Sequence, residues 1–161
     1  MIRNVKPGDA ESIAKIYNYY IENTAITFDE NPVTTGNIRQ KIAAICNKAY
    51  PYLVYEKDGQ PLGYAFISTW RPQSAYGISL ETSIYIDPQH TGKGLGSELY
   101  KALIEKSRQI NIHSLIAVIS LPNESSRKLH EKFGFRLIGN FKETGFKFGR
   151  LIDVEFWQKI L

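Results

Sequence analysis

A glycine-rich segment that follows an apolar run is the part of this sequence whose residue types point most clearly to chemistry. The run Ile84-Tyr85-Ile86 ends at Asp87-Pro88 and leads into His90-Thr91-Gly92-Lys93-Gly94-Leu95-Gly96. Glycines let a backbone adopt positive φ and approach a ligand closely. The unpaired N–H groups and the dipole of a helix N-terminus attract anions. The segment therefore predicts a phosphate-binding turn between a strand and a helix, to which Lys93 could add a positive charge.

The glycine spacing excludes two common nucleotide-binding loops. Neither G-x-x-x-x-G-K-[ST] nor G-x-G-x-x-G is present, and the next apolar run, residues 115–120, has no acidic residue for a ribose. A kinase and a nucleotide-dependent dehydrogenase therefore lose support. The residues alone leave open that the glycines only form a tight turn.

Two side chains elsewhere in the sequence could exchange protons. Glu81 stands in an otherwise apolar and hydroxyl-bearing run, and His130 lies between Leu129 and Phe133 on a predicted helix. A carboxylate can act as a general base, and an imidazole titrates near neutral pH. The pattern alone leaves Glu81 as a possible solvent-facing strand residue and His130 as a possible structural residue.

Two separate motifs in this order resemble the GNAT N-acetyltransferases. Residues Thr91 to Gly96 are similar to the acyl-CoA pyrophosphate loop Q/R-x-x-G-x-G/A, with Thr91 in place of the usual Gln or Arg. Residues Asn123 to Phe135 resemble the family pattern N-x-x-[SA]-x-x-x-[YH]-E-x-x-G-[FY]. The resemblance covers essentially the whole chain and is closest to the phosphinothricin and methionine sulfone N-acetyltransferase branch. The stretches that carry the branch resemblance are Asn18–Thr24, Trp70 with Ala75-Tyr76, Glu81–Ile86, Val118–Asn123 and Gly145–Val154.

This resemblance implies a fold and an activity. The fold would be α/β (α+β), a mixed, mostly antiparallel central sheet flanked by helices and splayed at the acyl-CoA site, with residues 1–161 as a single domain. The activity would be direct transfer of an acetyl group from acetyl-CoA, in a ternary complex, to the amine of a small amino-acid-like substrate. Phosphinothricin, methionine sulfoximine and methionine sulfone are the acceptors implied. The resemblance also implies a homodimer. No metal is expected, because no cluster of His, Asp or Glu has metal-ligand spacing.

The same resemblance assigns roles to individual residues. Glu81 would be the catalytic base, and His130, where many relatives have Tyr, would be the general acid for the departing thiolate. A backbone N–H at or near Ile86, after a bulge that opens the sheet, would polarise the carbonyl. The implied cofactor contacts are Tyr85, Ile86, Thr91, Gly92, Lys93, Gly94, Leu95, Gly96 and Asn123.

Aromatic residues are expected to line the acceptor pocket. The implied acceptor-binding residues are Phe28, Trp70, Arg71, Gln73 and Tyr76, with Phe148 as a further aromatic candidate. The branch commonly has Arg at the position of Gln73, for which nearby Arg71 could compensate. Lys147 and Arg150 could meet an acidic substrate or stay solvated. Gln73 therefore leaves open another amine, such as a polyamine, an aminoglycoside or a protein N-terminus, and a non-catalytic acyl-CoA-binding regulator is a further alternative.

The elements that must position these residues can be read from hydrophobic periodicity and turn residues. The pattern predicts helices near residues 13–21, 35–49, 95–104 and 123–132, and strands near 1–5, 52–55, 62–68, 78–86, 115–119, 136–139 and 151–156. Asp9 is the predicted N-cap of the first helix, and Asp58-Gly59 the predicted hairpin turn. The order β-α-α-β-β-β-α-β-α-β-β predicts a mixed sheet with helices packed on its faces.

Composition sets the outer limits. A chain of 161 residues with 43% hydrophobic and 22% charged residues is expected to form one globular domain. The single cysteine, Cys46, rules out a disulfide within one chain and is expected as a small core residue. The net charge of +4 is spread along the chain, which argues against nucleic-acid binding. Without a signal-like or membrane-spanning apolar run, the expected location is the cytoplasm.

Overall fold

The computed structural model describes residues 1–161 and contains four α-helices and seven strands in the predicted order. The helices are α1 (Ala10–Asn23), α2 (Thr35–Cys46), α3 (Leu95–Gln109) and α4 (Glu124–Lys132). The strands are β1 (Ile2–Asn4), β2 (Tyr52–Lys57), β3 (Gln60–Thr69), β4 (Ser79–Ile86), β5 (Ser114–Ser120), β6 (Arg136–Lys147) and β7 (Arg150–Ile160).

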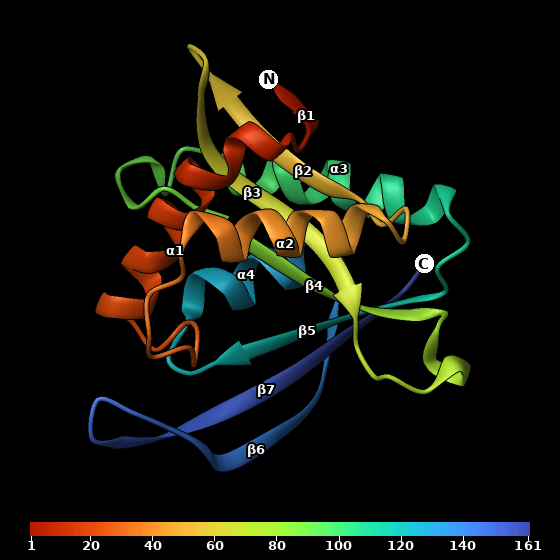
Figure 1. Cartoon of the computed structure of the whole chain (residues 1–161). Coiled ribbons are helices and arrows are strands. Elements are labelled where there is room, and N and C mark those ends of the chain that lie inside the picture. The colour runs from red at the N-terminus through yellow and green to blue at the C-terminus, as the bar shows by residue number, and fades with distance from the viewer.

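All seven strands belong to one sheet, in the order β1-β2-β3-β4-β5-β7-β6, and only the β4–β5 pair is parallel. Helices α1 and α2 lie against one face of this sheet and α3 against the other (Figure 1). Side chains alternate between the two faces: in β2, Tyr52 and Val54 pack with α1 and α2, whereas Leu53 packs with α3. The predicted mixed, mostly antiparallel sheet with helices on its faces is confirmed.

The sheet is open in its centre, where β4 and β5 separate. These strands pair only over Ser79–Glu81 and Ser114–Ile116. Beyond that point β4 stays paired with β3, and β5 stays paired with β7. The predicted splaying is therefore confirmed. The bulge that the resemblance implies in this strand is not seen in the pairing of β4 with β3, which runs without a register shift. Divergence of two regular strands opens the sheet instead.

Three local predictions differ from the structure. Strands β6 and β7 extend well beyond the predicted residues 136–139 and 151–156, because β6 is mostly solvent-exposed and so lacks a clear apolar pattern. Cys46 is exposed at the end of α2 instead of buried, since the core face of that helix is formed by other residues. Asp9 occupies the N-cap position of α1 but its side chain makes no capping hydrogen bond.

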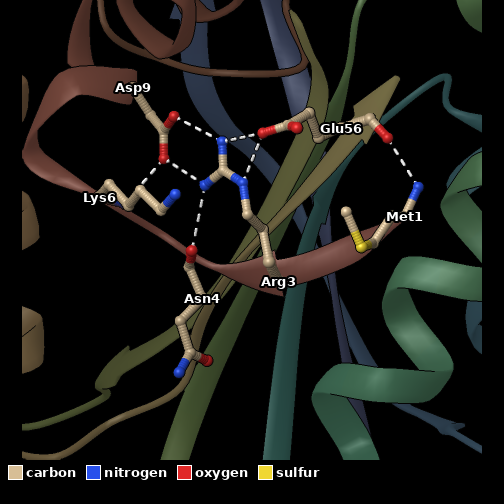
Figure 2. Close-up of polar contacts among 6 residues, drawn as sticks. All are labelled: Met1, Arg3, Asn4, Lys6, Asp9 and Glu56. Atoms are coloured by element: carbon tan, nitrogen blue, oxygen red, sulfur yellow. Dashed lines mark hydrogen bonds and ion pairs between the residues drawn. The ribbon is translucent and has the colours of Figure 1, made fainter. Parts of the chain in front are cut away.

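The Asp9 carboxylate instead holds the N-terminal strand in place. Figure 2 shows Arg3 donating to both oxygens of Asp9, at 2.8 Å each, and also pairing with Glu56 of β2. The Lys6 amide donates to the same carboxylate at 2.7 Å. Burial alone would raise the pKa of Asp9, but the hydrogen bonds from Arg3 and the Lys6 amide outweigh it and lower that pKa. Asp9 thus connects β1, the turn before α1 and, through Arg3, β2.

Replacing Asp9 by Asn should lower the free energy of unfolding at pH 7 by about 1–3 kcal/mol, the range for hydrogen bonds to charged groups. A lowered carboxyl pKa stabilises the fold above the unfolded-state pKa, about 3.9, and this contribution is lost as pH falls through the folded-state pKa. Denaturant melts from pH 7 to pH 2 should therefore show the wild-type and Asp9→Asn curves converging below about pH 4. Asp58→Asn, a change at an exposed turn carboxylate, is the control; equal losses in both variants would contradict the role of Asp9.

Candidate functional site

A cavity of about 340 Å³ occupies the gap between β4 and β5. Side chains from both faces of the sheet line this cavity, because no paired backbone separates the two faces where β4 and β5 part. Glu81 and Tyr17 border it from the face covered by α1 and α2, and Thr82 and His130 from the opposite face. The segment after α1, with Ile26, Thr27 and Phe28, closes part of the rim. The volume is in the range of small-molecule sites.

Glu81 lies where the two strands part, opposite Ile116 of β5. Its side chain alternates with those of Leu80 and Thr82, which pack on the α3 side. Burial raises the pKa of Glu81, and the positive charges of Lys41 and Arg71 oppose that rise in part. A half-buried carboxyl with a raised pKa is well suited to accept a proton within the cavity.

The His130 ring is held in one orientation, with 4% of the residue exposed. It packs edge-on against Tyr100 and Phe135, and its Nδ1 lies 2.7 Å from the Ser126 carbonyl oxygen. Since a carbonyl only accepts, Nδ1 must carry the proton, and Nε2 presents a lone pair when the ring is neutral. Burial lowers the pKa of His130, which the bond to Ser126 opposes in part. The ring is therefore neutral at pH 7, with an unprotonated Nε2.

A second cavity, of about 470 Å³, runs beside the glycine-rich turn. Gly94 is the N-cap of α3 and has φ 86°, a left-handed conformation that favours glycine. The amides of Leu95, Gly96 and Ser97 have no carbonyl four residues back in the helix, so they remain free to bind a ligand. The predicted phosphate-binding geometry, a strand followed by a turn with positive φ and a helix N-terminus, is present.

The open edge of β4 adds further donors to this groove. The Asp87 amide donates to the Leu62 carbonyl of the neighbouring chain segment. In an antiparallel ladder successive residues alternate in direction, so the amides of Ile84 and Ile86 point away from β3 and into the gap. The Ile86 carbonyl is bound by the Tyr20 hydroxyl at 2.5 Å, which leaves its amide as the free group.

The two cavities are adjacent parts of one cleft. Five residues border both of them: Ile26, Ile84, Tyr85, Asn123 and Ser126. Among them Asn123 also caps α4, because its Oδ1 accepts from the Ser126 amide at 3.2 Å. A ligand lying along the glycine-rich groove could thus reach the first cavity, the chamber that contains Glu81 and His130.

Most of the predicted cofactor contacts border the groove. They are Tyr85, Ile86, Thr91, Gly92, Gly94, Leu95, Gly96 and Asn123. Lys93 is not on its wall; its Nζ donates to the Gln89 carbonyl at 3.0 Å. Two lysines that the sequence interpretation missed, Lys128 and Lys132, do border the groove. Their i, i+4 spacing on the predicted helix 123–132 was a usable signal that both share one face.

Only one of the predicted acceptor-binding residues lies on the wall of the Glu81 cavity. Phe28 borders the Glu81 cavity, whereas Trp70, Arg71, Gln73 and Tyr76 do not. These four belong to the β3–β4 connection, where the ring of Trp70 contacts that of Tyr76 edge-on, with 5.2 Å between centroids, and Arg71 stacks over Trp70. The residues of the cavity wall that the sequence interpretation missed include Tyr17, Lys41, Phe66, Val118 and Ser120.

Lys147 anchors the rim segment and is neither solvated nor in the cavity. Only 3% of the residue is exposed, and its Nζ donates to the carbonyls of Ile21, Thr27 and Asp29 at 2.8–2.9 Å. The expectation that it meets substrate or stays solvated is therefore wrong. Gly145, two residues earlier in β6, seats Phe28: a Cβ there would lie 2.2 Å from the ring.

No group of three or more His, Cys, Asp or Glu side chains is arranged to hold a metal ion. None of the helices combines the length and apolar character needed to cross a membrane.

Comparison with known proteins adds independent information. Residues 2–156 match the family model described as acetyltransferase (GNAT) domain. The chain is 37% identical to a phosphinothricin N-acetyltransferase of Streptomyces coelicolor, over 98% of this chain and 95% of that protein. It is 37% identical to an L-methionine sulfoximine/L-methionine sulfone acetyltransferase of Pseudomonas paraeruginosa, over 98% and 92%. A phosphinothricin acetyltransferase of Sinorhizobium meliloti, solved in complex with AcCoA, superposes with a TM-score of 0.97 at 35% identity, covering 100% of this chain and 88% of that one.

Replacing Lys147 by Met should release the rim segment, because three carbonyls would lose a charged donor. We expect the free energy of unfolding to fall by roughly 2–3 kcal/mol, and limited proteolysis to cut residues 24–30 faster than in the wild type. Lys142→Met, on the same strand, is the control, because its ammonium lies at the surface in an ion pair with Asp153 and does not contact the rim segment. Unchanged proteolysis of the segment in Lys147→Met would show that Lys147 does not hold it.

Proposed function

The chain belongs to the GNAT family of acetyltransferases, and from that premise we propose that it moves the acetyl group of acetyl-CoA to the amine of a small amino-acid-like acceptor. The observation that carries this proposal is the junction of the glycine-rich groove with the chamber that contains Glu81. The glycine-rich groove can bind the phosphates of a ligand, and the chamber contains a carboxylate that can act as a base. Phosphinothricin, methionine sulfoximine and methionine sulfone are the acceptors to test first, because the similar proteins named above carry those names.

The residues present fit acetyl-CoA. The free amides at the start of α3 are suited to pyrophosphate oxygens, and Lys128 and Lys132 add positive charge along the groove. Tyr85 and Asn123 border both the groove and the chamber, and Ile86 borders the groove next to Tyr85. Bound acetyl-CoA supplies an acetyl group activated as a thioester. The protein contributes binding of both reactants side by side, which recovers much of the entropy of a bimolecular step.

We assign the base to Glu81. An α-amine has a pKa of about 8, so it is mostly protonated at pH 7 and must lose a proton before it attacks. Glu81 is the carboxylate of the chamber wall, and its burial favours the proton-bound product of that transfer. Attack of the neutral amine on the carbonyl carbon forms the new C–N bond and leaves a second proton to be removed from the nitrogen. The C–S bond then breaks with the electron pair leaving on sulfur, and that second proton passes through His130 to the thiolate.

His130 and Ile86 take the supporting roles. The free Ile86 amide would donate to the carbonyl oxygen as negative charge develops there. His130 can return a proton to the thiolate only after its Nε2 has taken one, because its Nδ1 proton is bound to the Ser126 carbonyl. We therefore assign His130 as a proton acceptor first and a donor second.

We further propose that residues 1–161 act as one acetyltransferase domain in a cytoplasmic homodimer. All seven strands share one sheet, which supports a single domain. Several large apolar side chains of β6, β7 and their turn are exposed, which supports a contact between two copies: Leu137, Ile138, Phe141, Phe146, Phe148 and Leu151.

The first test is thiol release from acetyl-CoA with a panel of amines. L-phosphinothricin, L-methionine sulfone, a polyamine, an aminoglycoside and a peptide N-terminus would be compared. Release with the first two that falls by roughly 10²–10⁴ in Glu81→Gln would support the proposal, with Ser83→Ala as a cavity-wall control. No release with either amino-acid analogue would reject the acceptor class.

The pH profile tests the base independently. A base works when ionised, so kcat/KM should fall as pH drops through the raised pKa of Glu81, with a midpoint above the ordinary value of 4.5. Glu81→Gln should remove this limb from its residual activity. A limb that persists unchanged in the variant would assign the titration to another group.

The groove lysines give a separate test of cofactor binding. Lys128→Met and Lys132→Met should each raise the KM for acetyl-CoA about two- to fivefold, as expected of exposed charge contacts. The effect should shrink as salt is added, while the KM for the amine stays unchanged. Lys101→Met, an exposed change on α3 away from the groove, is the control; a KM shift as large as those of the groove variants would contradict the assignment.

A further inference from the structure

Lys41 is a cation on the wall of the acceptor chamber to which neither acetyl-CoA binding nor proton transfer assigns a role. It comes from α2, and its ammonium lies 4.5 Å from the ring centroid of Phe66 and 5.6 Å from that of Tyr17. Both rings also border the chamber. The ammonium therefore reaches over the aromatic wall, although Lys41 as a whole residue is exposed.

No group of the protein neutralises this charge by contact. No carboxylate lies within 4 Å of the Lys41 ammonium, and it makes no hydrogen bond within the chain. Asp29, whose negative charge acts on Lys41 more strongly than that of Glu81, accepts a hydrogen bond from the Tyr17 hydroxyl at 2.6 Å. Burial lowers the pKa of Lys41, and the charges of Asp29 and Glu81 oppose this in part. An ammonium has three donors, so its binding capacity is unused.

The chamber wall carries one negative and one positive side chain. Among its lining residues, Glu81 is the sole carboxylate and Lys41 the sole permanent cation, while His130 is neutral at pH 7. Arg71, the other cation whose charge reaches Glu81, lies outside the wall and stacks over Trp70. A zwitterion is the ligand that such a pair complements, with its amine toward the carboxylate and its acid group toward the ammonium.

We propose that Lys41 binds the acid group of the acceptor and thereby selects α-amino acids over simple amines. The inference rests on the proposed function, since it assigns the acceptor end of the same cleft. Holding the acid group at Lys41 directs the amine toward Glu81. Beside these aromatic rings, where water is partly excluded, the attraction between a carboxylate and the ammonium is stronger than it would be in water.

The test compares two acceptors that differ only in the acid group. L-methionine sulfone and 3-(methylsulfonyl)propylamine, its decarboxylated form, would be assayed with the wild type, Lys41→Met and Lys41→Arg. Lys48→Met is the matched control, because its ammonium also lies over a ring, that of Tyr50, but outside the chamber. Circular dichroism and thermal melts would check that each variant is folded.

Lys41→Met should raise the KM for L-methionine sulfone roughly 10- to 100-fold. The KM for the decarboxylated amine and for acetyl-CoA should stay unchanged. Lys41→Arg should keep most of the discrimination, and Lys48→Met all of it. Equal changes for both amines in Lys41→Met, or none for either, would overturn the role of Lys41 while leaving the acetyltransferase proposal intact.

Calorimetry separates the two proposals if no turnover is seen. L-methionine sulfone would be titrated into the protein saturated with CoA. Binding by the wild type that is lost in Lys41→Met would support the acid-binding role even though the acceptor reaction had failed. Binding that survives in Lys41→Met, or no binding by the wild type, would overturn the role of Lys41.

Discussion

The end of strand pairing between β4 and β5 is the constraint on which the rest of this structure depends. Each strand keeps one partner, β3 or β7, and beyond Glu81 and Ile116 each leaves its other edge open. A sheet normally separates the side chains of its two faces. Here the opening joins them, so that Glu81 on the α1–α2 face and His130 on the opposite face border one chamber. The same opening frees the amides of Ile84 and Ile86 for a ligand.

An opening of this kind must be supported at its wide end. The segment after α1 spans it, and three contacts fix that segment: Ser120 donates to the Ala25 carbonyl, Lys147 to three carbonyls, and Gly145 makes room for Phe28. Backbone carbonyls satisfy the buried ammonium of Lys147, which avoids the cost of a buried charge without hydrogen-bond partners. Lys147 and Gly145 thus hold the rim without bordering the chamber, whereas Ser120 and Phe28 take part in both.

Burial also sets the protonation of the chamber groups. Glu81 and His130 shift in opposite directions, the carboxyl toward a higher pKa and the imidazole toward a lower one, because burial disfavours the charged form of each. The bond from Nδ1 to Ser126 further fixes which ring nitrogen is available. The positive charges of the cleft come from other residues than Glu81 and His130. Lys128 and Lys132 lie along the groove, and Lys41 lies at the acceptor end.

The sequence by itself determined the order of elements, the glycine-rich turn and the family, because these depend on local periodicity, on residues that allow positive φ and on motif spacing. Glu81 and His130 could be singled out for the same reason. Tertiary structure alone decided that Lys41 reaches the chamber while Trp70, Gln73 and Tyr76 do not border it, and that Lys147 is buried. No local sequence pattern predicts these positions. Each depends on where a side chain of α2, of the β3–β4 connection or of β6 lies relative to the gap between β4 and β5, which are distant from it in sequence.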